Sequence, residues 1–317
     1  MSAVRSPAVA ALAALALATA AGCAAGDSEA GAPSEGGAVP TTSVSHGRDV
    51  ARRARVDRFD GRRAFALLAR QVRYGPRPAG SRALRRLSLD LRARLPRGRF
   101  EAVPGRPRGM RNIVGFLPGR GKAILVGAHY DTKAIPGFVG ANDGAAGTAA
   151  VVELVRSLAH GRPACARPIR FVLFDGEESP DDSRDFYATG LRGSKVYAAR
   201  HARALHSVVI VDFVANHGVT LPREMGSDER MWARLRAAAQ RVGVGAVFPD
   251  EVTGEILDDH TPFARRGIPA IDLIDFSYPH FHRITDDLDA VSARSLDAVG
   301  EALVEFLRRE SLAPCRR

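Results

Sequence analysis

Short apolar runs alternate with helical stretches over the second half of the chain. Each run has the length of a strand, and the stretch after it places apolar residues at helical spacing. The pattern predicts strands at residues 123–128, 169–174, 207–211 and 270–274, and helices at residues 147–158, 193–205, 228–242 and 292–309. Nearly continuous Val, Ile and Leu strands that alternate with helices predict a mainly parallel sheet covered on both faces, which is a three-layer α/β/α sandwich.

Two more helical stretches and one strand come before this alternating part. Apolar residues recur at helical spacing over residues 65–72 and 84–95, on either side of the turn at residues 74–78. Residues 112–117 have the composition of a strand, which Pro118 and Gly119 end.

The N-terminal residues have the pattern of an export signal followed by a tether. Arg5 precedes an apolar run at residues 8–21, which is too short to span a bilayer as a stable helix. The residues after it are rich in Gly, Ala, Ser and Pro and cannot bury enough apolar surface to fold. We therefore predict a signal peptide at residues 1–22, a flexible tether at 23–50 and a single domain at 51–317.

Export also decides how the three cysteines are interpreted. Ala20-Ala21-Gly22-Cys23 resembles a bacterial lipobox, which would lipidate Cys23 and anchor the protein to the cell envelope; ordinary cleavage nearby would instead release it. Cys165 and Cys315 then remain, and an even pair in an oxidising compartment is a candidate disulfide. Two unpaired thiols are the alternative.

Composition and charge narrow the classes of partner. A chain of 317 residues with 45% hydrophobic content can bury one substantial core. The net charge of +11 raises the question of nucleic-acid binding, but the arginines are scattered, and no zinc-finger, RRM or helix-turn-helix pattern accompanies them. We therefore expect no nucleic-acid partner and a basic surface that attracts anionic partners or lipid headgroups. We also expect the protein to be a monomer.

Acidic and imidazole residues follow the predicted strands at their carboxyl ends. His129 comes directly after the first of the four strands, Glu177 and Glu178 follow the second, Asp212 follows the third, and His282 lies in the loop after the fourth. Ligands of open α/β sheets gather at these strand ends. The sequence therefore predicts that these side chains share one site.

A glycine-flanked turn at residues 140–144 brings Asp143 to the same place. Carboxylates packed this closely would repel one another and raise each other's pKa. A divalent cation removes that conflict, and mixed imidazole and carboxylate ligands suit zinc.

The order of these motifs resembles the zinc aminopeptidase family that also contains the animal-type glutaminyl cyclases. The resemblance covers the chain from about Tyr74 to its end and implies an enzyme that acts on peptide or protein N-termini. The matching residues are Gly80-Ser81, Asn112-Ile-Val, His129-Tyr-Asp-Thr-Lys133, Phe138-Val-Gly-Ala-Asn-Asp-Gly144, Phe174-Asp-Gly-Glu-Glu178, Asp212, Leu257-Asp-Asp-His-Thr-Pro-Phe263, and His282 with Asp286.

The resemblance implies a ligand set for one or two zinc ions. Asp143 would be shared, Glu178 and His282 would complete one zinc site, and His129 with Asp212 would complete a second. Glu177 would be the general acid and base beside the metal.

Two further aspartates would support these ligands from outside the metal site. Asp131 would hold the His129 ring, as is common for metal-bound imidazoles. Asp286 follows His282 by four residues, as in the family motif, which favours His282 over His280 as the ligand.

Details outside the ligand set favour the cyclase branch of the family. Asp258-Asp259-His260 resembles its Asp-Asp-His motif, in which Asp258 would belong to a proton relay and His260 would donate a hydrogen bond near the developing oxyanion. The insertion at residues 179–191 also resembles cyclases, whereas Phe281, in the substrate pocket, replaces a cyclase tryptophan.

We therefore favour a glutaminyl-peptide cyclotransferase, which converts an N-terminal glutamine to pyroglutamate and releases ammonia. A zinc metallo-aminopeptidase that hydrolyses N-terminal residues is the alternative. A lipid-tethered binding module without catalysis is a third hypothesis. Degenerate relatives of that kind usually lack the base or a ligand, and here both Glu177 and every ligand position are occupied.

Overall fold

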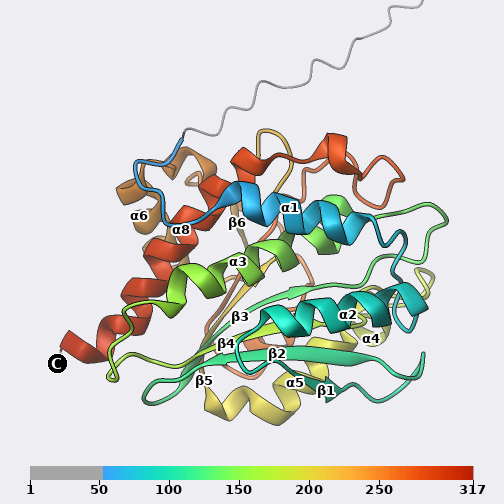
Figure 1. Ribbon diagram of the computed structural model, residues 1–317, viewed down its shortest axis with the longest axis horizontal. Helices are drawn as coiled ribbons and strands as arrows, with labels where there is room; N and C mark the ends of the chain where they lie inside the picture. Colours follow the sequence, from blue (N-terminus) through green and yellow to red (C-terminus); the bar gives the residue numbers. More distant parts are fainter. Residues whose placement is uncertain (1–52, 317) are drawn as a thin grey trace, which may run out of the picture. The chain divides into compact units, whose positions relative to one another are not determined.

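A six-stranded sheet forms the middle of the computed structural model, which describes residues 53–316 (Figure 1). Its strand order is β1-β2-β4-β3-β5-β8. The strands β4, β3, β5 and β8 are parallel, whereas β2 is antiparallel to both β1 and β4. The strands are β1 (Arg99–Ala102), β2 (Arg111–Leu117), β3 (Ala123–His129), β4 (Ile169–Phe174), β5 (Leu205–Val211) and β8 (Ala270–Leu273), and β6 (Arg223–Glu224) pairs separately with β7 (Val252–Thr253).

Helices cover both faces of this sheet. The first core cluster joins α1, α2, α3, α6 and α8 to one face, and the second joins α5 and α7 to the other. The helices are α1 (Gly61–Val72), α2 (Arg82–Arg94), α3 (Gly147–Ala159), α4 (Phe186–Thr189), α5 (Arg192–His201), α6 (Glu229–Val242), α7 (Thr261–Ala264) and α8 (Ala293–Leu312). The predicted three-layer α/β/α sandwich is confirmed. None of the described helices is long and apolar enough to cross a bilayer.

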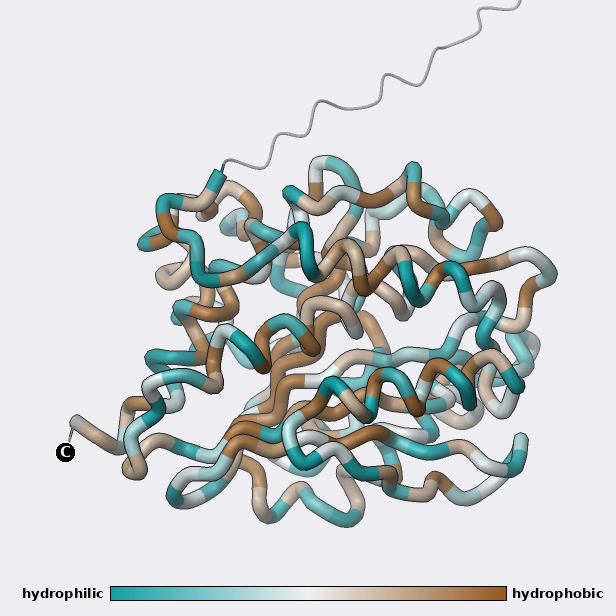
Figure 2. The backbone as a smooth tube through the Cα atoms, in the orientation of Figure 1, coloured by the Kyte–Doolittle hydropathy of each residue, from teal (hydrophilic) through white to brown (hydrophobic). Residues whose placement is uncertain are grey.

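The central strands are buried on both sides, which explains their continuous apolar sequence. All seven residues of β3 are buried. Consecutive side chains of a strand point to opposite faces, so Leu125 packs in the core under α5 while Val126 packs in the core under α3. In Figure 2 the chain segments made of hydrophobic residues lie in the middle of the molecule.

The observed elements differ from the predicted ones mainly at the edges. The five predicted strands lie within two residues of their predicted bounds, but β1 was not predicted, because its side chains are only partly buried and form no apolar run. The helix predicted at residues 193–205 ends at His201, because Leu205 already belongs to β5 and packs in the second core cluster. The predicted signal peptide, Cys23 and the whole predicted tether lie outside the described residues.

Cys165 and Cys315 form a disulfide bond, and their Cα atoms are 5.3 Å apart. Cys165 lies in the loop before β4, and Cys315 lies in the short turn after α8. A backbone hydrogen bond of 2.8 Å from Arg167 to Ser311 joins the same two segments. The bond therefore closes a long loop between segments that already lie side by side.

We predict that this disulfide contributes about 3–5 kcal/mol to the free energy of unfolding, because it restricts a long loop of the unfolded chain. The double variant Cys165→Ala/Cys315→Ala should melt roughly 6–15 °C lower than the wild type. Thermal unfolding is measured with a chelator present, so that bound metal does not contribute. A phosphine reductant should lower the melting temperature of the wild type and leave that of the double variant unchanged. Two free thiols in protein unfolded without reductant would contradict the bond.

Candidate active site

The turn that carries Asp143 is shaped by two glycines and one carboxylate. Gly140 and Gly144 have φ angles of 52° and 92°, and a Cβ atom on Gly140 would lie 2.2 Å from the Asp143 carbonyl oxygen. The Asp286 carboxylate accepts hydrogen bonds from the backbone N–H groups of Asn142 (2.8 Å) and Asp143 (3.0 Å). Asp286 therefore supports Asp143, the expected shared ligand, through the backbone of its turn.

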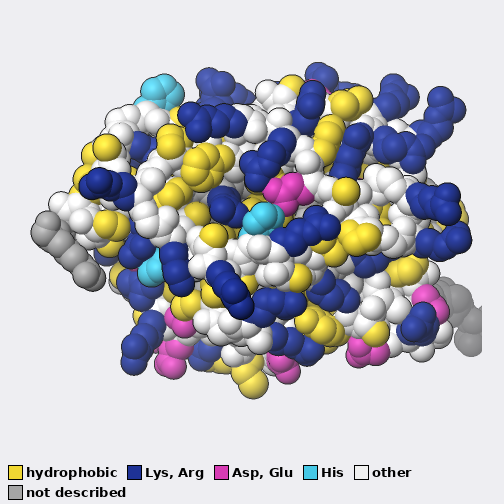
Figure 3. Space-filling model, turned by 90° about the horizontal axis from the view of Figure 1, so that it is seen from below, with side chains coloured by type: hydrophobic (Ala, Val, Ile, Leu, Met, Phe, Trp, Pro, Cys, Tyr) yellow, Lys and Arg dark blue, Asp and Glu magenta, His cyan; other side chains and the backbone are white. Residues whose placement is uncertain are grey.

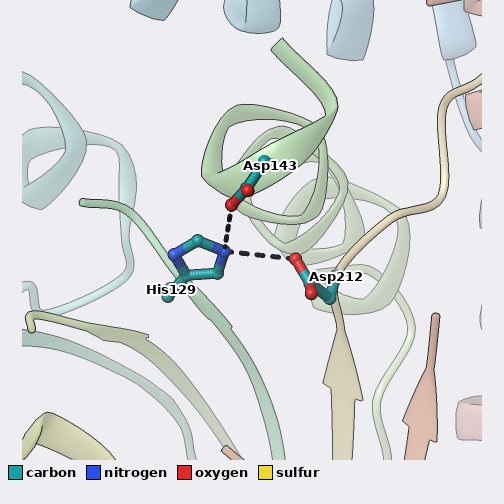
Figure 4. Close-up of side chains that lie close together, drawn as sticks. All are labelled: His129, Asp143 and Asp212. Atoms are coloured by element: carbon teal, nitrogen blue, oxygen red, sulfur yellow. Dashed lines mark hydrogen bonds and ion pairs between the residues drawn. The ribbon is translucent and has the colours of Figure 1, made fainter. Parts of the chain in front are cut away.

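His129 brings together the first group of candidate metal ligands (Figure 4). It is the last residue of β3, and Asp212 directly follows β5. The His129 Nε2 atom lies 3.1 Å from Oδ1 of Asp212 and 3.3 Å from Oδ1 of Asp143. All three side chains are buried.

His282 forms a second group with Glu178 and the same Asp143. Its Nε2 atom lies 3.4 Å from Oε2 of Glu178 and 3.7 Å from Oδ2 of Asp143. The two oxygens of Asp143 therefore face different histidines. The His282 backbone has a φ of 52°, and its ring stacks on Phe281 with 3.9 Å between the ring centroids.

Both groups fit a metal ion. Zinc binds imidazole nitrogens and carboxylate oxygens at about 2.0–2.2 Å, which places neighbouring ligands of a tetrahedral site about 3.4 Å apart. The ligand atoms of each group lie within 4.8 Å of one another. Oδ2 of Asp143 and Oε1 of Glu178 are buried and have no hydrogen-bond partner among the described residues. A cation bound by Asp143, Glu178 and His282 would satisfy these atoms, and a cation at either group would offset the repulsion among the carboxylates.

The protein environment changes the proton affinities of these ligands. Burial and then the charge of Glu178 raise the pKa of Asp143 to about 6. Burial also raises the pKa of Asp212. Burial lowers the pKa of His129, but the carboxylates beside it raise that pKa by more, so it ends well above the usual value. Metal binding at this site therefore competes with protons.

Glu177 lies beside both groups without belonging to either. It follows β4 after Asp175 and Gly176, and 8% of its surface is exposed. Burial raises its pKa well above the usual value for a glutamate, the charge of His129 lowers it, and the neighbouring carboxylates raise it. Oδ1 of Asp131 accepts the Glu177 backbone N–H at 3.2 Å and lies 3.8 Å from Nδ1 of His129. Asp131 thus contacts both Glu177, the expected general base, and a candidate ligand.

Arg77 supports the site but was not predicted as a site residue. Its side chain is fully buried, and its guanidinium donates hydrogen bonds to the carbonyl oxygens of Gly75 (3.0 Å), Val139 (2.8 Å) and Gly140 (3.2 Å). Burial lowers its pKa to about 10, against the opposing charges of nearby carboxylates that include Asp143, so it remains a cation at neutral pH. The only sequence signal for Arg77 was its place in the turn at residues 74–78.

A cavity of about 340 Å³ opens beside these groups. Its lining combines candidate ligands and Glu177 with apolar side chains. It is lined by Lys133, Asp143, Glu177, Glu178, Asp182, Phe186, Asp212, Phe213, Glu255, Ile256, Leu257, Asp258, Ile274, Phe276, Phe281 and His282. Phe281 contacts both Phe213 and Phe276, with ring centroids 5.6 and 5.1 Å apart.

The insertion at residues 179–191 contributes to this cavity through Asp182 and Phe186. Lys133 forms an ion pair with Asp182, and its Nζ atom lies 3.6 Å from Oε2 of Glu178. Lys133 therefore connects the insertion to a candidate metal ligand, a contact that the sequence motif around Lys133 did not predict.

Two histidines of the sequence motifs lie away from the cavity. His280 is half-buried, and its ring hydrogen-bonds to Oγ1 of Thr285 at 2.8 Å. His260 was expected near the developing oxyanion, but its ring nitrogens lie 3.4 Å from Glu224 and 3.6 Å from Asp272. The chain enters α7 directly after His260, and the His260 ring is buried against β6 and β8. Of the three residues Asp258-Asp259-His260, only Asp258 lines the cavity.

Comparison with known proteins places this geometry among enzymes of related chemistry. The chain is 28% identical over 242 residues to the glutaminyl-peptide cyclotransferase of Bos taurus, a match that covers 63% of this chain and 66% of the bovine protein, just under two thirds of it. The structure resembles a glutaminyl cyclase from an Acidobacteriales bacterium, with a TM-score of 0.73, 28% identity, and coverage of 81% of this chain and 96% of that one.

A relative with a different activity matches equally well. A leucine aminopeptidase precursor from Bacteroides thetaiotaomicron has a TM-score of 0.71 and 25% identity, and the match covers 80% of this chain and 98% of that one. The model of peptidase family M28 matches residues 112–307, more than half of the chain and the part that holds every candidate ligand. The chain therefore belongs to peptidase family M28.

Proposed function

We propose that this chain is a zinc-dependent glutaminyl-peptide cyclotransferase that acts on peptide N-termini. The observation that carries the proposal is that Asp258 and Glu177 line the same small cavity as the ligand group Asp143, Glu178 and His282. The cavity volume lies at the lower end of the range for small-molecule sites and suits one side chain with the backbone next to it.

Asp143, Glu178 and His282 would hold the zinc ion that the reaction uses. Zinc bound there would act as a Lewis acid toward the γ-amide carbonyl of the N-terminal glutamine. The His282 ring is held between Phe281, which stacks on it, and Phe138, which meets it edge-on at 6.2 Å. The apolar wall around Phe281 would bind the substrate's hydrocarbon atoms.

Glu177 would move the one proton that cyclisation transfers. The α-amine of the glutamine forms a bond to the carbonyl carbon of its own side-chain amide (Cδ), the bond from that carbon to the amide nitrogen breaks, and ammonia leaves. The amine loses a proton and the departing nitrogen gains one, so a single carboxyl group serves as base and then as acid. The raised pKa of Glu177 suits this role near neutral pH, and the charge of Asp258 is one of the causes of that shift.

A zinc aminopeptidase is the second candidate, and one observation favours it. His129 and Asp212 face Oδ1 of Asp143, so the chain holds a complete second group of ligands. Hydrolysis needs an activated water, and two adjacent metal ions are a common means of producing it. Cyclisation needs no water, but it does need a proton transfer in which the Asp258 carboxylate would take part. Water activation does not require that carboxylate.

The proposal also includes export and attachment to a membrane by lipidated Cys23. Both rest on the N-terminal sequence, which lies outside the described residues. The tether would let the cavity reach N-termini of proteins and peptides at the cell envelope.

We expect Glu177→Gln to lower kcat by about two to four orders of magnitude, which is typical for loss of a general base. Metal content and melting temperature should stay at wild-type values, because Glu177 is not a ligand. Glu251→Gln, the same change at an exposed position, is the matched control and should retain activity. Turnover of the Glu177 variant within a few-fold of wild type would remove the proton-shuttle role.

The two candidate reactions predict opposite sensitivities at Asp258 and His129. For a cyclase, Asp258→Ser should abolish ammonia release, and one zinc ion per chain should support full activity. For a peptidase, Asp258→Ser should be mild, His129→Ala severe, and activity should rise until two ions are bound. Mass spectrometry of peptides with N-terminal glutamine or leucine distinguishes loss of ammonia from loss of a residue. Efficient removal of leucine with a two-metal requirement would overturn the cyclase proposal.

We expect Arg77→Met to weaken zinc binding by about 10- to 100-fold, as is typical for residues that orient metal ligands. The reason is that Arg77 holds the carbonyl groups of the turn that carries Asp143 and offsets the negative charge there. Arg77→Lys should recover part of the affinity, and Arg73→Met, an exposed change, should have no effect. Competition with a chromophoric chelator measures affinity, and melting of the metal-free proteins separates it from folding. Equal affinity in Arg77→Met and wild type would reject this role.

A further inference from the structure

Positive charge is concentrated at the end of the sheet where the parallel strands begin. Four segments meet there: residues 92–99 lead into β1, residues 118–122 connect β2 to β3, and residues 160–170 and 199–206 lead into β4 and β5. Together they contain eleven Arg or Lys and no Asp or Glu. We call these four segments the basic end, which lies on the left in Figure 1.

Few of these cations are neutralised within the described part of the chain. Arg94 and Arg99 form ion pairs, with Asp90 and Glu101. No carboxylate pairs with the other nine cations among residues 53–316. Figure 3, which views the molecule from the side of β1 and α5, shows Lys and Arg side chains spread over the surface and few Asp or Glu among them.

The fold keeps some arginines of the basic end partly buried and fixed in place, although their like charges repel one another. The Nε atoms of Arg162 and Arg167 are buried and have no hydrogen-bond partner among the described residues. The disulfide of Cys165 lies between them in the sequence and fixes this loop to the C-terminal turn. Burial and the charge of Arg167 lower the pKa of His206 in the adjacent segment. Anions bound at this end would relieve the repulsion.

The opposite end of the same strands carries the candidate active site. β3 begins directly after Lys122 and ends at His129, so its seven residues separate the basic end from the metal ligands by about 20 Å. An anionic surface docked at the basic end would therefore leave the cavity open on the far side.

We propose that the basic end is a docking surface for a bilayer that contains anionic phospholipids. The cations are spread over four separate loops, which suits an extended charged surface better than a single small ligand. Stacking on nucleic-acid bases is disfavoured, because the ring of Phe100, on β1, is already covered by the guanidinium groups of Arg92 (5.1 Å) and Arg111 (3.9 Å). A basic surface combined with a lipid anchor in the same chain is a common pair of membrane signals, because one acyl chain alone binds only marginally.

The test is vesicle flotation of the full chain with Cys23→Ser, which removes the lipid attachment site. One variant reverses four exposed cations of the basic end: Arg97→Glu, Arg120→Glu, Lys122→Glu and Arg203→Glu. The matched control makes the same change in net charge at four exposed cations elsewhere: Arg62→Glu, Arg73→Glu, Arg230→Glu and Arg283→Glu. Vesicles of phosphatidylcholine alone report binding that does not depend on lipid charge, including binding by the apolar N-terminal run.

We expect binding to vesicles that contain phosphatidylglycerol, loss of that binding in 0.5 M salt, and a decrease of at least about 100-fold in the basic-end variant. The control variant should bind within about threefold of the parent, and melting curves should show that all chains fold. Equal losses in both variants would show that net charge alone is responsible and would overturn the proposal. So would equal binding to neutral vesicles, or binding to duplex DNA without binding to anionic vesicles.

Discussion

Repulsion among buried carboxylates is the constraint around which the rest of this structure is arranged. Asp143, Glu178 and Asp212 approach one another at the carboxyl ends of the parallel strands, where burial denies them the solvation that water would provide. A cluster of this kind is stable only if protons or cations neutralise it. The two histidines place nitrogen atoms among these carboxylates at distances that fit a divalent cation, so the cluster that repels in the metal-free protein is also the candidate metal site.

Neighbouring elements hold this repelling group in place from behind. The parallel strands fix His129 and Asp212, but Asp143 lies in a turn whose backbone must be held by other means. Arg77 binds the carbonyl groups on one side of that turn, and Asp286 binds the N–H groups on the other. A cation on carbonyls and an anion on amides bind opposite ends of the peptide dipoles, so together they orient the turn and offset each other's charge.

The sequence predicted the parts of the molecule that depend on local pattern. Apolar runs identify strands buried on both faces, and acidic residues after them identify the site, because both signals lie within a few residues of one strand. Arg77 gave no such signal, because a single arginine in a turn is usually exposed and only the fold shows that it is buried. The position of the His260 ring likewise depends on β6 and β8, which are distant in sequence. Edge strand β1 was missed because it buries little apolar surface.

The position of the candidate ligand Asp143 is compatible with both reactions found among the relatives. Its two oxygens face His129 and His282 separately, so the same residues fit either one ion or two without a change in the backbone. The ligands alone therefore do not choose between cyclisation and hydrolysis. The choice must come from groups around the metal that decide whether water or the substrate's own amine attacks. Under the proposed function these groups are Asp258 and the phenylalanines, which line the same cavity as Glu177 and the candidate ligands.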